Sequence, residues 1–494
     1  MTTKPDGRFH FLTLIRRLGR IGVTMFAGAF LTVLAGFIIF MQQQQDLRVW
    51  HTADLDEEYT TEKQVTGFAG YLALEDRLFS QLEAEIYDKI PLDERQLLNR
   101  YSRGSLSDPA QWANNWNRSF EFTVPKPVAG VLLLHGLSDS PYSLRKMGQK
   151  LSASGAYVLG LRIPGHGTAP SGLVKIKWED MAGAVRLAMG HLKKQFGDIP
   201  LYIVGYSNGG ALAVQYILST LENVSLPRAS GVVLISPEIG VAKIAALAVW
   251  QDRIGRLLSL PKLAWNSVLP EYDPFKYNSF AVNAGHQAFR LTNEIQNQIT
   301  RYTKSDVLSQ LPPIMAFQSV VDATVRVPAL IEGLFDRLPQ GDHELVLFDI
   351  NRLAAKNPLM DTGPRDVIAA LLDKPILSYR LSLISNESAS SRKVALYQRY
   401  TGSSEKTVFP LSLAWPAGVY SLSHVALPFA PDDPLYGGDD AEKSPGINIG
   451  NVVLRGEKGV LRINPASLLR LHWNPFYDYL EQRVLQFTAL RGSE

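Results

Sequence analysis

LYIVGYSNGG, residues 201–210, is the stretch that decides the fold of this chain. Residues 201–204 are an apolar run typical of a buried strand, and residues 211–218 continue with helical character. Between them, residues 205–209 fit the pattern G-x-S-x-G, in which a serine occupies a sharp turn from strand to helix. The glycines beside Ser207 let the two elements approach closely. A glycine-rich turn with an incidental serine is the alternative, but the strand before and the helix after favour a nucleophile.

Two further motifs lie where neighbouring apolar runs end. HGLSDSP, residues 135–141, follows the run 128–134, and RIPGHGT, residues 162–168, closes the run 157–162. Together with GYSNGG they resemble the α/β-hydrolase superfamily, most closely the branch that holds monoacylglycerol lipases, lysophospholipases and serine aminopeptidases. The resemblance covers roughly residues 120–429.

This resemblance implies a doubly wound, mostly parallel sheet with a helical cap, and it implies no cofactor and no metal. It also implies that the backbone N–H groups of Leu137 and Asn208 hold the oxyanion that forms when a serine attacks an acyl carbonyl. In this family histidines placed like His135 and His166 mostly hold loops by hydrogen bonds. That structural role is expected here, with proton donation as the alternative.

The remaining pattern agrees with such a sheet, because apolar strands alternate with helical segments. Strands are expected at residues 119–124, 128–134, 157–162, 201–204, 231–236, 313–318 and 344–349. Helices are expected at residues 66–89, 144–152 and 180–196, and a helical region at 465–490. A parallel sheet carries its ligand site at the carboxyl ends of the strands, which is where Ser207 lies.

A serine hydroxyl needs an oriented base, and this fold orders the serine, the acid and the histidine in that sequence along the chain. Asp322 directly follows the strand 313–318 and is predicted to be the acid. Asp306 precedes the same strand, so a solvated position or a helix cap is expected for it instead.

The base is predicted to be His424, which follows a short alternating run. His343 is the alternative, but it precedes the strand 344–349 and therefore stands at the wrong end of a parallel sheet. With His424 as the base, residues 351–416 become an insertion before it. Two strand-like runs in this insertion are expected to extend the sheet at its edge, residues 377–384 and 394–397.

A long insertion, residues 238–303, separates two core strands and is rich in aromatic and aliphatic side chains. The resemblance implies a cap over the site, and an apolar cap suits an acyl chain. A cap that only packs on the core would have the same composition, so both interpretations stay open. The acidic turn 432–440 lacks the spacing of an EF-hand and is expected to be a solvated loop.

Near the N-terminus, IGVTMFAGAFLTVLAGFIIFM, residues 21–41, carries no charge. A helix of this length rises ~1.5 Å per residue and spans about 31 Å, which matches a bilayer core. Three arginines precede the run and acidic residues dominate after it, so the N-terminus is expected in the cytoplasm and the rest of the chain outside. A cleaved signal peptide is the alternative to a retained anchor.

Composition bounds the remaining choices. The 494 residues include no cysteine, which excludes disulfides and thiolate metal sites. A net charge of +3, without a basic cluster interleaved with aromatics, argues against nucleic acid as a partner. Four parts are expected: a basic tail (1–20), an anchor (21–41), a juxtamembrane and helical segment (42–118) and the hydrolase domain (119–494).

These features predict a membrane-anchored serine hydrolase with Ser207, Asp322 and His424 as its triad and an acyl ester or lipid as its substrate. A serine aminopeptidase and an acyltransferase would use the same three residues and are alternatives. An inactive hydrolase fold that serves as a binding module is a further alternative, against which the complete set of three residues argues.

Overall fold

The computed structural model describes residues 20–22, 24–32, 35–36, 39, 45–240, 261–303, 306–356, 365–452 and 463–490. The chain divides into two compact units, Met1–Leu47 and Arg48–Glu494. The segment 48–118 belongs to the same compact unit as residues 119–494, so the predicted boundary between residues 118 and 119 does not separate two units.

In the first unit, the described residues between 20 and 39 are helical. Part of the predicted span 21–41 lies outside the described residues, namely 23, 33–34, 37–38 and 40–41. Across the described part of the chain, we find no helix with the length and apolar character needed to cross a membrane.

The second unit is built on a ten-stranded sheet, counted over the described residues, with the order β1-β3-β2-β4-β5-β8-β9-β10-β11-β12. From β3 to β10 all neighbours pair in parallel, whereas β1, β11 and β12 join antiparallel at the two edges. The strands are β1 (Phe120–Phe122), β2 (Ala129–Leu134), β3 (Ala156–Leu161), β4 (Leu201–Tyr206), β5 (Gly231–Ile235), β8 (Ile314–Ser319), β9 (Glu344–Phe348), β10 (Arg380–Asn386), β11 (Lys393–Arg399) and β12 (Lys406–Ala414).

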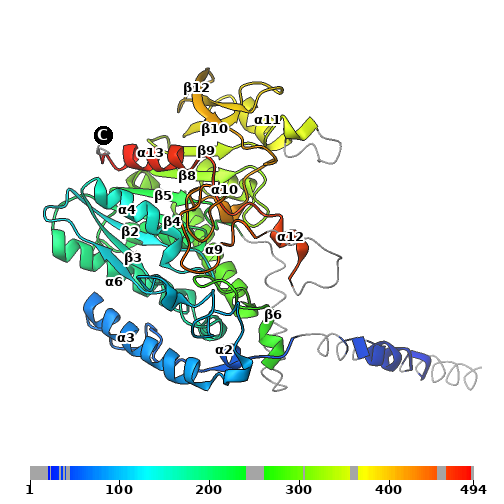
Figure 1. Ribbon diagram of the computed structural model, residues 1–494. Helices are drawn as coiled ribbons and strands as arrows, with labels where there is room; N and C mark the ends of the chain where they lie inside the picture. The colour runs from blue at the N-terminus through cyan, green and yellow to red at the C-terminus, as the bar shows by residue number, and fades with distance from the viewer. Residues whose placement is uncertain are drawn as a thin grey trace, which may run out of the picture. The chain divides into compact units, whose positions relative to one another are not determined.

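Helices cover both faces of this sheet (Figure 1). On one face α4 contacts β3 and β1 and also packs on α13; on the other, α6 and α7 contact β2 and α9 packs against α7. The longer helices are α3 (Gly67–Glu85), α4 (Arg145–Ala153), α6 (Trp178–Phe196), α7 (Asn208–Glu222), α9 (Val282–Tyr302), α10 (Val327–Gly333), α11 (Arg365–Asp373) and α13 (Tyr477–Phe487). Short helices are α2 (Val49–Thr52), α5 (Gly172–Lys175) and α12 (Pro465–Leu468), and a small hairpin pairs β6 (Trp265–Ser267) with β7 (Phe280–Ala281).

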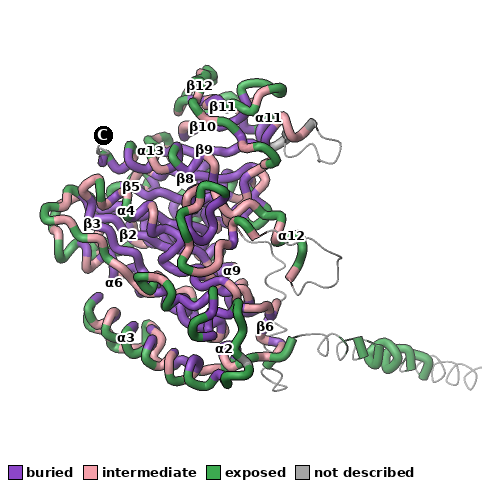
Figure 2. Tube along the Cα trace, in the orientation of Figure 1, coloured by how far each residue is buried: buried purple, intermediate pink, exposed green. Residues whose placement is uncertain are grey.

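The core lies between the sheet and its helices, and the central strands are drawn as buried along their length (Figure 2). Successive strand residues point to opposite faces, so alternate positions such as Val131, Leu133 and Val204 meet α4 and α13 in one hydrophobic cluster. Both faces of these strands are covered, which explains their continuous apolar runs.

The insertion before His424 extends the sheet, as predicted. β10 continues the parallel order beside β9, and β11 and β12 then return antiparallel. β12 was not predicted: its residues alternate weakly, it contains Pro410 and it is mostly exposed at the sheet edge. The alternating run before His424 is not a strand, since residues 419–423 have neither helix nor strand structure.

A buried ion network joins the segment before β1 to the sheet. Arg162, at the end of β3, donates two hydrogen bonds of 2.8 and 2.9 Å to the carboxylate of Glu58. Its Nε donates to Glu75 on α3 at 3.1 Å. Because the Arg162 side chain is fully buried, removal of either carboxylate would leave an incompletely paired charge in the interior.

Acid should destabilise this fold through its buried histidines. Burial lowers the pKa of four of them from 6.5 to about 4 and that of His135 well below 6.5; the four are His51, His166, His343 and His472. Between pH 6.5 and 4 these five histidines therefore bind more protons in the unfolded chain than in the folded one, while the raised pKa values of Glu238 (about 7) and Asp273 (about 6) act in the opposite sense.

We expect the free energy of unfolding, measured with urea, to be full above pH 6.5 and to fall as the pH drops toward 4. His343→Asn, which removes one of these groups, should make the fall shallower. A free energy of unfolding that is flat between pH 7 and pH 5 would contradict this account.

Candidate active site

Ser207 occupies a strained turn between β4 and α7. Its backbone has φ 53° and ψ −117°, a conformation that costs a non-glycine residue of order 1–3 kcal/mol. Its N–H donates to Ile235 O of the neighbouring strand at 2.9 Å, which fixes the turn. A Cβ on Gly205 would lie 2.5 Å from Gly209 O, and one on Gly209 would overlap Leu134 O. The glycines of GYSNGG are therefore needed because strand and helix meet at backbone contact.

The three residues predicted as a triad come together at the carboxyl edge of the sheet. His424 Nε2 lies 3.1 Å from Ser207 Oγ. His424 Nδ1 lies 2.8 Å from Asp322 Oδ2. All three side chains are buried. A hydroxyl, an imidazole and a carboxylate in series can pass a proton from the hydroxyl to the imidazole while the carboxylate stabilises the charged ring.

Asp322 is held by donors on both carboxylate oxygens. The backbone N–H groups of Thr324 and Val325 donate to Oδ1 at 2.8 and 2.9 Å. Gln318 Nε2 donates to Oδ2 at 2.9 Å. Burial alone would raise the pKa of Asp322, but His424 and the two backbone donors hold that pKa below its usual value. The carboxylate therefore stays ionised at neutral pH.

Two backbone segments flank Ser207 where an oxyanion would form. Asn208 is the first residue of α7, and N–H groups at the start of a helix have no acceptor within the helix. Leu137 lies in the turn after β2. This turn passes beside the site, because a Cβ on the preceding residue, Gly136, would lie 3.2 Å from Ser207 Cβ. Asn208 thus directly follows Ser207, and the residue before Leu137 lies against the Ser207 side chain.

Three other histidines lie within hydrogen-bond distance of backbone groups away from the triad. His135 Nε2 accepts from Ile163 N at 3.0 Å and its Nδ1 lies 2.9 Å from Gly136 O, so this ring joins the loops after β2 and β3. His166 Nδ1 lies 3.0 Å from Pro164 O. His343 precedes β9, where its Nδ1 accepts from Ile314 N at the start of β8, at the opposite end of the sheet from Ser207.

Of the cap insertion 238–303, residues 241–260 with Trp250 lie outside the described residues. The described part is joined to the turn after β2, since Tyr277 N donates to Ser138 O at 2.8 Å and Lys276 Nζ binds Asp139 at 2.8 Å. Trp265, Phe275 and Tyr277 are buried, so these aromatic residues of the cap serve packing.

The acidic turn 432–440 differs from its expected solvated state. Asp433 is buried and forms an ion pair of 2.8 Å with Arg145 on α4, while Asp432 pairs with Lys146. Tyr142 also donates to Asp433 at 2.9 Å. The turn therefore fastens the C-terminal region to α4. Over the described residues, no group of three His, Asp or Glu side chains is arranged to hold a metal ion.

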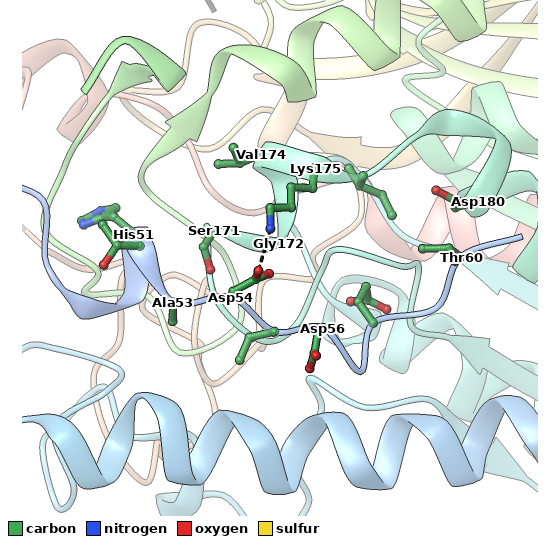
Figure 3. A pocket seen from close by; sticks show the side chains of 14 residues that line it. His51, Ala53, Asp54, Asp56, Thr60, Ser171, Gly172, Val174, Lys175 and Asp180 are labelled. Atoms are coloured by element: carbon green, nitrogen blue, oxygen red, sulfur yellow. Dashed lines mark hydrogen bonds and ion pairs between the residues drawn. The ribbon is translucent and has the colours of Figure 1, made fainter. Parts of the chain in front are cut away.

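A cavity of about 390 Å³ lies outside the triad, and Figure 3 shows the side chains that line it. Its walls come from residues 51–60 and 171–180, and Asp54 and Lys175 form an ion pair of 2.7 Å on its rim. None of the three triad residues lines it, so this cavity does not serve the chemistry of Ser207.

Three polar residues that support the site were not predicted from the sequence. Gln318 contacts Asp322, Ser319 Oγ donates to Leu422 O at 2.9 Å, and Asn351 contacts the segment before His424. Their only signal in the sequence is position, because each lies at or just after the carboxyl end of a predicted strand. Their partners are distant backbone groups or a side chain that only the folded chain identifies.

Parts of the chain are similar to known proteins. Residues 125–350 match the family described as serine aminopeptidase, S33. A thermostable monoacylglycerol lipase of Bacillus sp. (strain H-257) is 30% identical over 28% of this chain and 56% of its own length. Phospholipase YtpA of Bacillus subtilis (strain 168) is 24% identical over 29% of this chain and 51% of its own length. The chain thus spans about half the length of these curated relatives.

Among solved structures, the monoacylglycerol lipase of Paleococcus ferrophilus is 20% identical, with a TM-score of 0.35, over 47% of this chain and 88% of its own. The family match includes Ser207 and Asp322 and ends before His424. Residues 125–350 are thus similar to the serine aminopeptidase S33 family, and the mostly parallel sheet with Ser207 at the turn after β4 has the α/β-hydrolase arrangement.

Proposed function

We propose that this protein is a serine hydrolase that cleaves a carboxylic ester through an acyl-enzyme. The observation that carries the proposal is the continuous contact from Ser207 Oγ to His424 and from His424 to Asp322, at 3.1 and 2.8 Å. Ser207 attacks the acyl carbonyl while His424 Nε2 takes the hydroxyl proton, and Asp322 stabilises the imidazolium that forms.

The same residues complete the turnover. His424 gives its proton to the leaving alcohol, and a water then attacks the acyl-enzyme with His424 again as the base. The N–H groups of Leu137 and Asn208 stabilise the oxyanion in both steps, an effect worth about 3–4 kcal/mol per donor in such sites.

For the substrate we propose a lipid-like acyl ester. Support comes from the names of the similar proteins, a monoacylglycerol lipase and a phospholipase. The family description favours one second candidate, a serine aminopeptidase. Hydrolysis rates for a series of p-nitrophenyl esters, lysophospholipids and aminoacyl amides separate the two, and faster cleavage of the amides would favour the peptidase.

We also propose that residues 21–41 anchor the chain in a membrane, with the N-terminus cytoplasmic and the catalytic unit on the outer side. The support is the uncharged apolar run and the arginines before it. Exposed apolar side chains on the described helical residues agree with a lipid environment, among them Met25, Phe26 and Phe30.

A fluorophosphonate probe should label the wild-type protein and should not label Ser207→Ala, because the probe reacts with an activated serine. Gel fluorescence after denaturation measures the labelling. Ser236→Ala is the matched control, since Ser236 also has a positive φ and lies at the end of the next strand. Labelling that persists in Ser207→Ala would remove Ser207 from the mechanism.

His424→Ala should lower kcat for a p-nitrophenyl ester by several orders of magnitude, because serine and imidazole act as one unit. His343→Ala should keep most of the activity, since His343 lies at the other end of the sheet. Circular dichroism checks that both variants fold. The opposite ranking of the two variants would assign the base to His343.

In spheroplasts that express the protein, protease added outside should digest the catalytic unit and spare a short N-terminal fragment. Immunoblots against tags at each end measure the result. Protection until the cells are lysed would reverse the proposed orientation.

A further inference from the structure

The segment that delivers His424 reaches the site without the support of a strand ladder. Residues 419–423 have no helix or strand, so their carbonyl groups lack the partners that a sheet would give them. Three of these carbonyls are bonded to core residues at the carboxyl edge of the sheet instead. Ser319 Oγ donates to Leu422 O at 2.9 Å, and the other two carbonyls are bonded by a single residue, Asn351.

Asn351 donates hydrogen bonds to two successive carbonyl groups of this segment. Its Nδ2 donates to Val419 O at 2.8 Å, and its backbone N–H donates to Tyr420 O at 2.8 Å. The side chain is buried, with 4% of the residue exposed, so water does not compete for these bonds. Asn351 thus fixes the chain four residues before the imidazole.

The inserted hairpin holds Asn351 in turn. Asn386, the last residue of β10, donates from Nδ2 to Asn351 Oδ1 at 3.2 Å and accepts from Arg352 N at 2.7 Å. The same Nδ2 donates to Ser391 O in the turn between β10 and β11 at 2.6 Å. A chain of buried amides therefore leads from the insertion to the backbone before His424.

We propose that Asn351 is a positioning residue for His424, and that the insertion acts on the base through Asn386 and Asn351. This inference rests on the proposed function, because it assigns Asn351 a role only through the imidazole. In this fold the base is expected directly after the strand that corresponds to β9. Asn351 stands at that place in the chain. The proposed base, His424, follows 73 residues later (424 minus 351), and Asn351 binds the segment that precedes it.

The effect of Asn351 on turnover follows from the geometry of proton transfer. His424 must keep Nε2 within hydrogen-bond reach of Ser207 Oγ, and a displacement of about 1 Å costs up to about 100-fold in rate. Substrate binding does not require the imidazole to be in place. Loss of the amide should therefore lower kcat and leave KM nearly unchanged.

The test compares Asn351→Ala with a matched control, Asn283→Ala. Asn283 is also buried, and its Nδ2 also donates to two backbone carbonyls, Leu173 O and Ile176 O, both at 2.9 Å, but it lies on α9 and has no contact with the triad. We expect kcat for a p-nitrophenyl ester to fall about 10- to 100-fold in Asn351→Ala with KM within about twofold. Asn386→Ala should change kcat in the same direction by less.

Asn283→Ala should lower Tm comparably without this loss of kcat. An equal fall of kcat in both variants, or less than a twofold fall in Asn351→Ala, would overturn the proposal.

A second measurement uses the His424→Ala background, with circular dichroism to check that the double variant is folded. Without the imidazole, a residue that acts only by positioning it has nothing left to position. Adding Asn351→Ala to His424→Ala should therefore leave the residual activity unchanged. A further fall of tenfold or more would show that Asn351 acts by another route. Full activity of His424→Ala alone would instead contradict the proposed function, which is a different result from either outcome for Asn351.

Discussion

Backbone contact between β4 and α7 is the constraint on which the rest of the structure depends. Gly209 packs against Leu134 O and Gly205 against Gly209 O, so neither position has room for a side chain. This contact forces Ser207 into its positive φ and lifts Oγ from the edge of the sheet. It also brings the start of α7 beside the turn after β2, which places the N–H of Asn208 and the segment of Leu137 at the same point. One close approach thus generates the position of the nucleophile and of the groups that would stabilise its oxyanion.

A second constraint concerns how His424, which is distant in the sequence, is held beside Ser207. Between β9 and His424 the chain builds two antiparallel strands at the sheet edge and returns as irregular backbone. Backbone of this kind is fixed only by the partners of its polar groups. Here the partners are Asn351 and Ser319, both at strand ends. Residues at the ends of sheet strands therefore position the imidazole of His424, although no strand directly precedes this residue.

Buried charges join the parts of the chain that lie outside the α/β core to that core. Arg162 binds Glu58 and Glu75 from the N-terminal segment, and Arg145 binds Asp433 from the C-terminal region. Such pairs add less to stability than their number suggests, because desolvation offsets most of the attraction. Their geometry is specific, however, because each guanidinium donates to its carboxylates in a fixed orientation. The additions before and after the hydrolase core are thereby held in register with it.

The sequence by itself determined the order of strands and helices, the turn at Ser207 and the position of Asp322. These features are local, since an apolar run, a glycine pattern and a residue directly after a strand can be read from adjacent positions. The choice of His424 over His343 rested on the end of the strand at which each stands, and the structure brings His424 to Ser207 while His343 stays at the opposite end. The alternating run predicted before His424 forms neither helix nor strand, so the sequence did not show how that segment is held.

Only the tertiary structure decided which distant groups meet. Gln318, Ser319 and Asn351 are ordinary polar residues at strand ends, and their partners lie 4, 103 and 68 residues away. Asp433, expected in solvent, is buried because Arg145 and Tyr142 reach it from α4 and from the turn before that helix. The edge strand β12 has too little alternation to be recognised, since it pairs on one side and faces solvent on the other. Hydrogen bonds across such separations leave no periodic trace in the sequence, because they depend on how the chain is folded and not on the spacing of its residues.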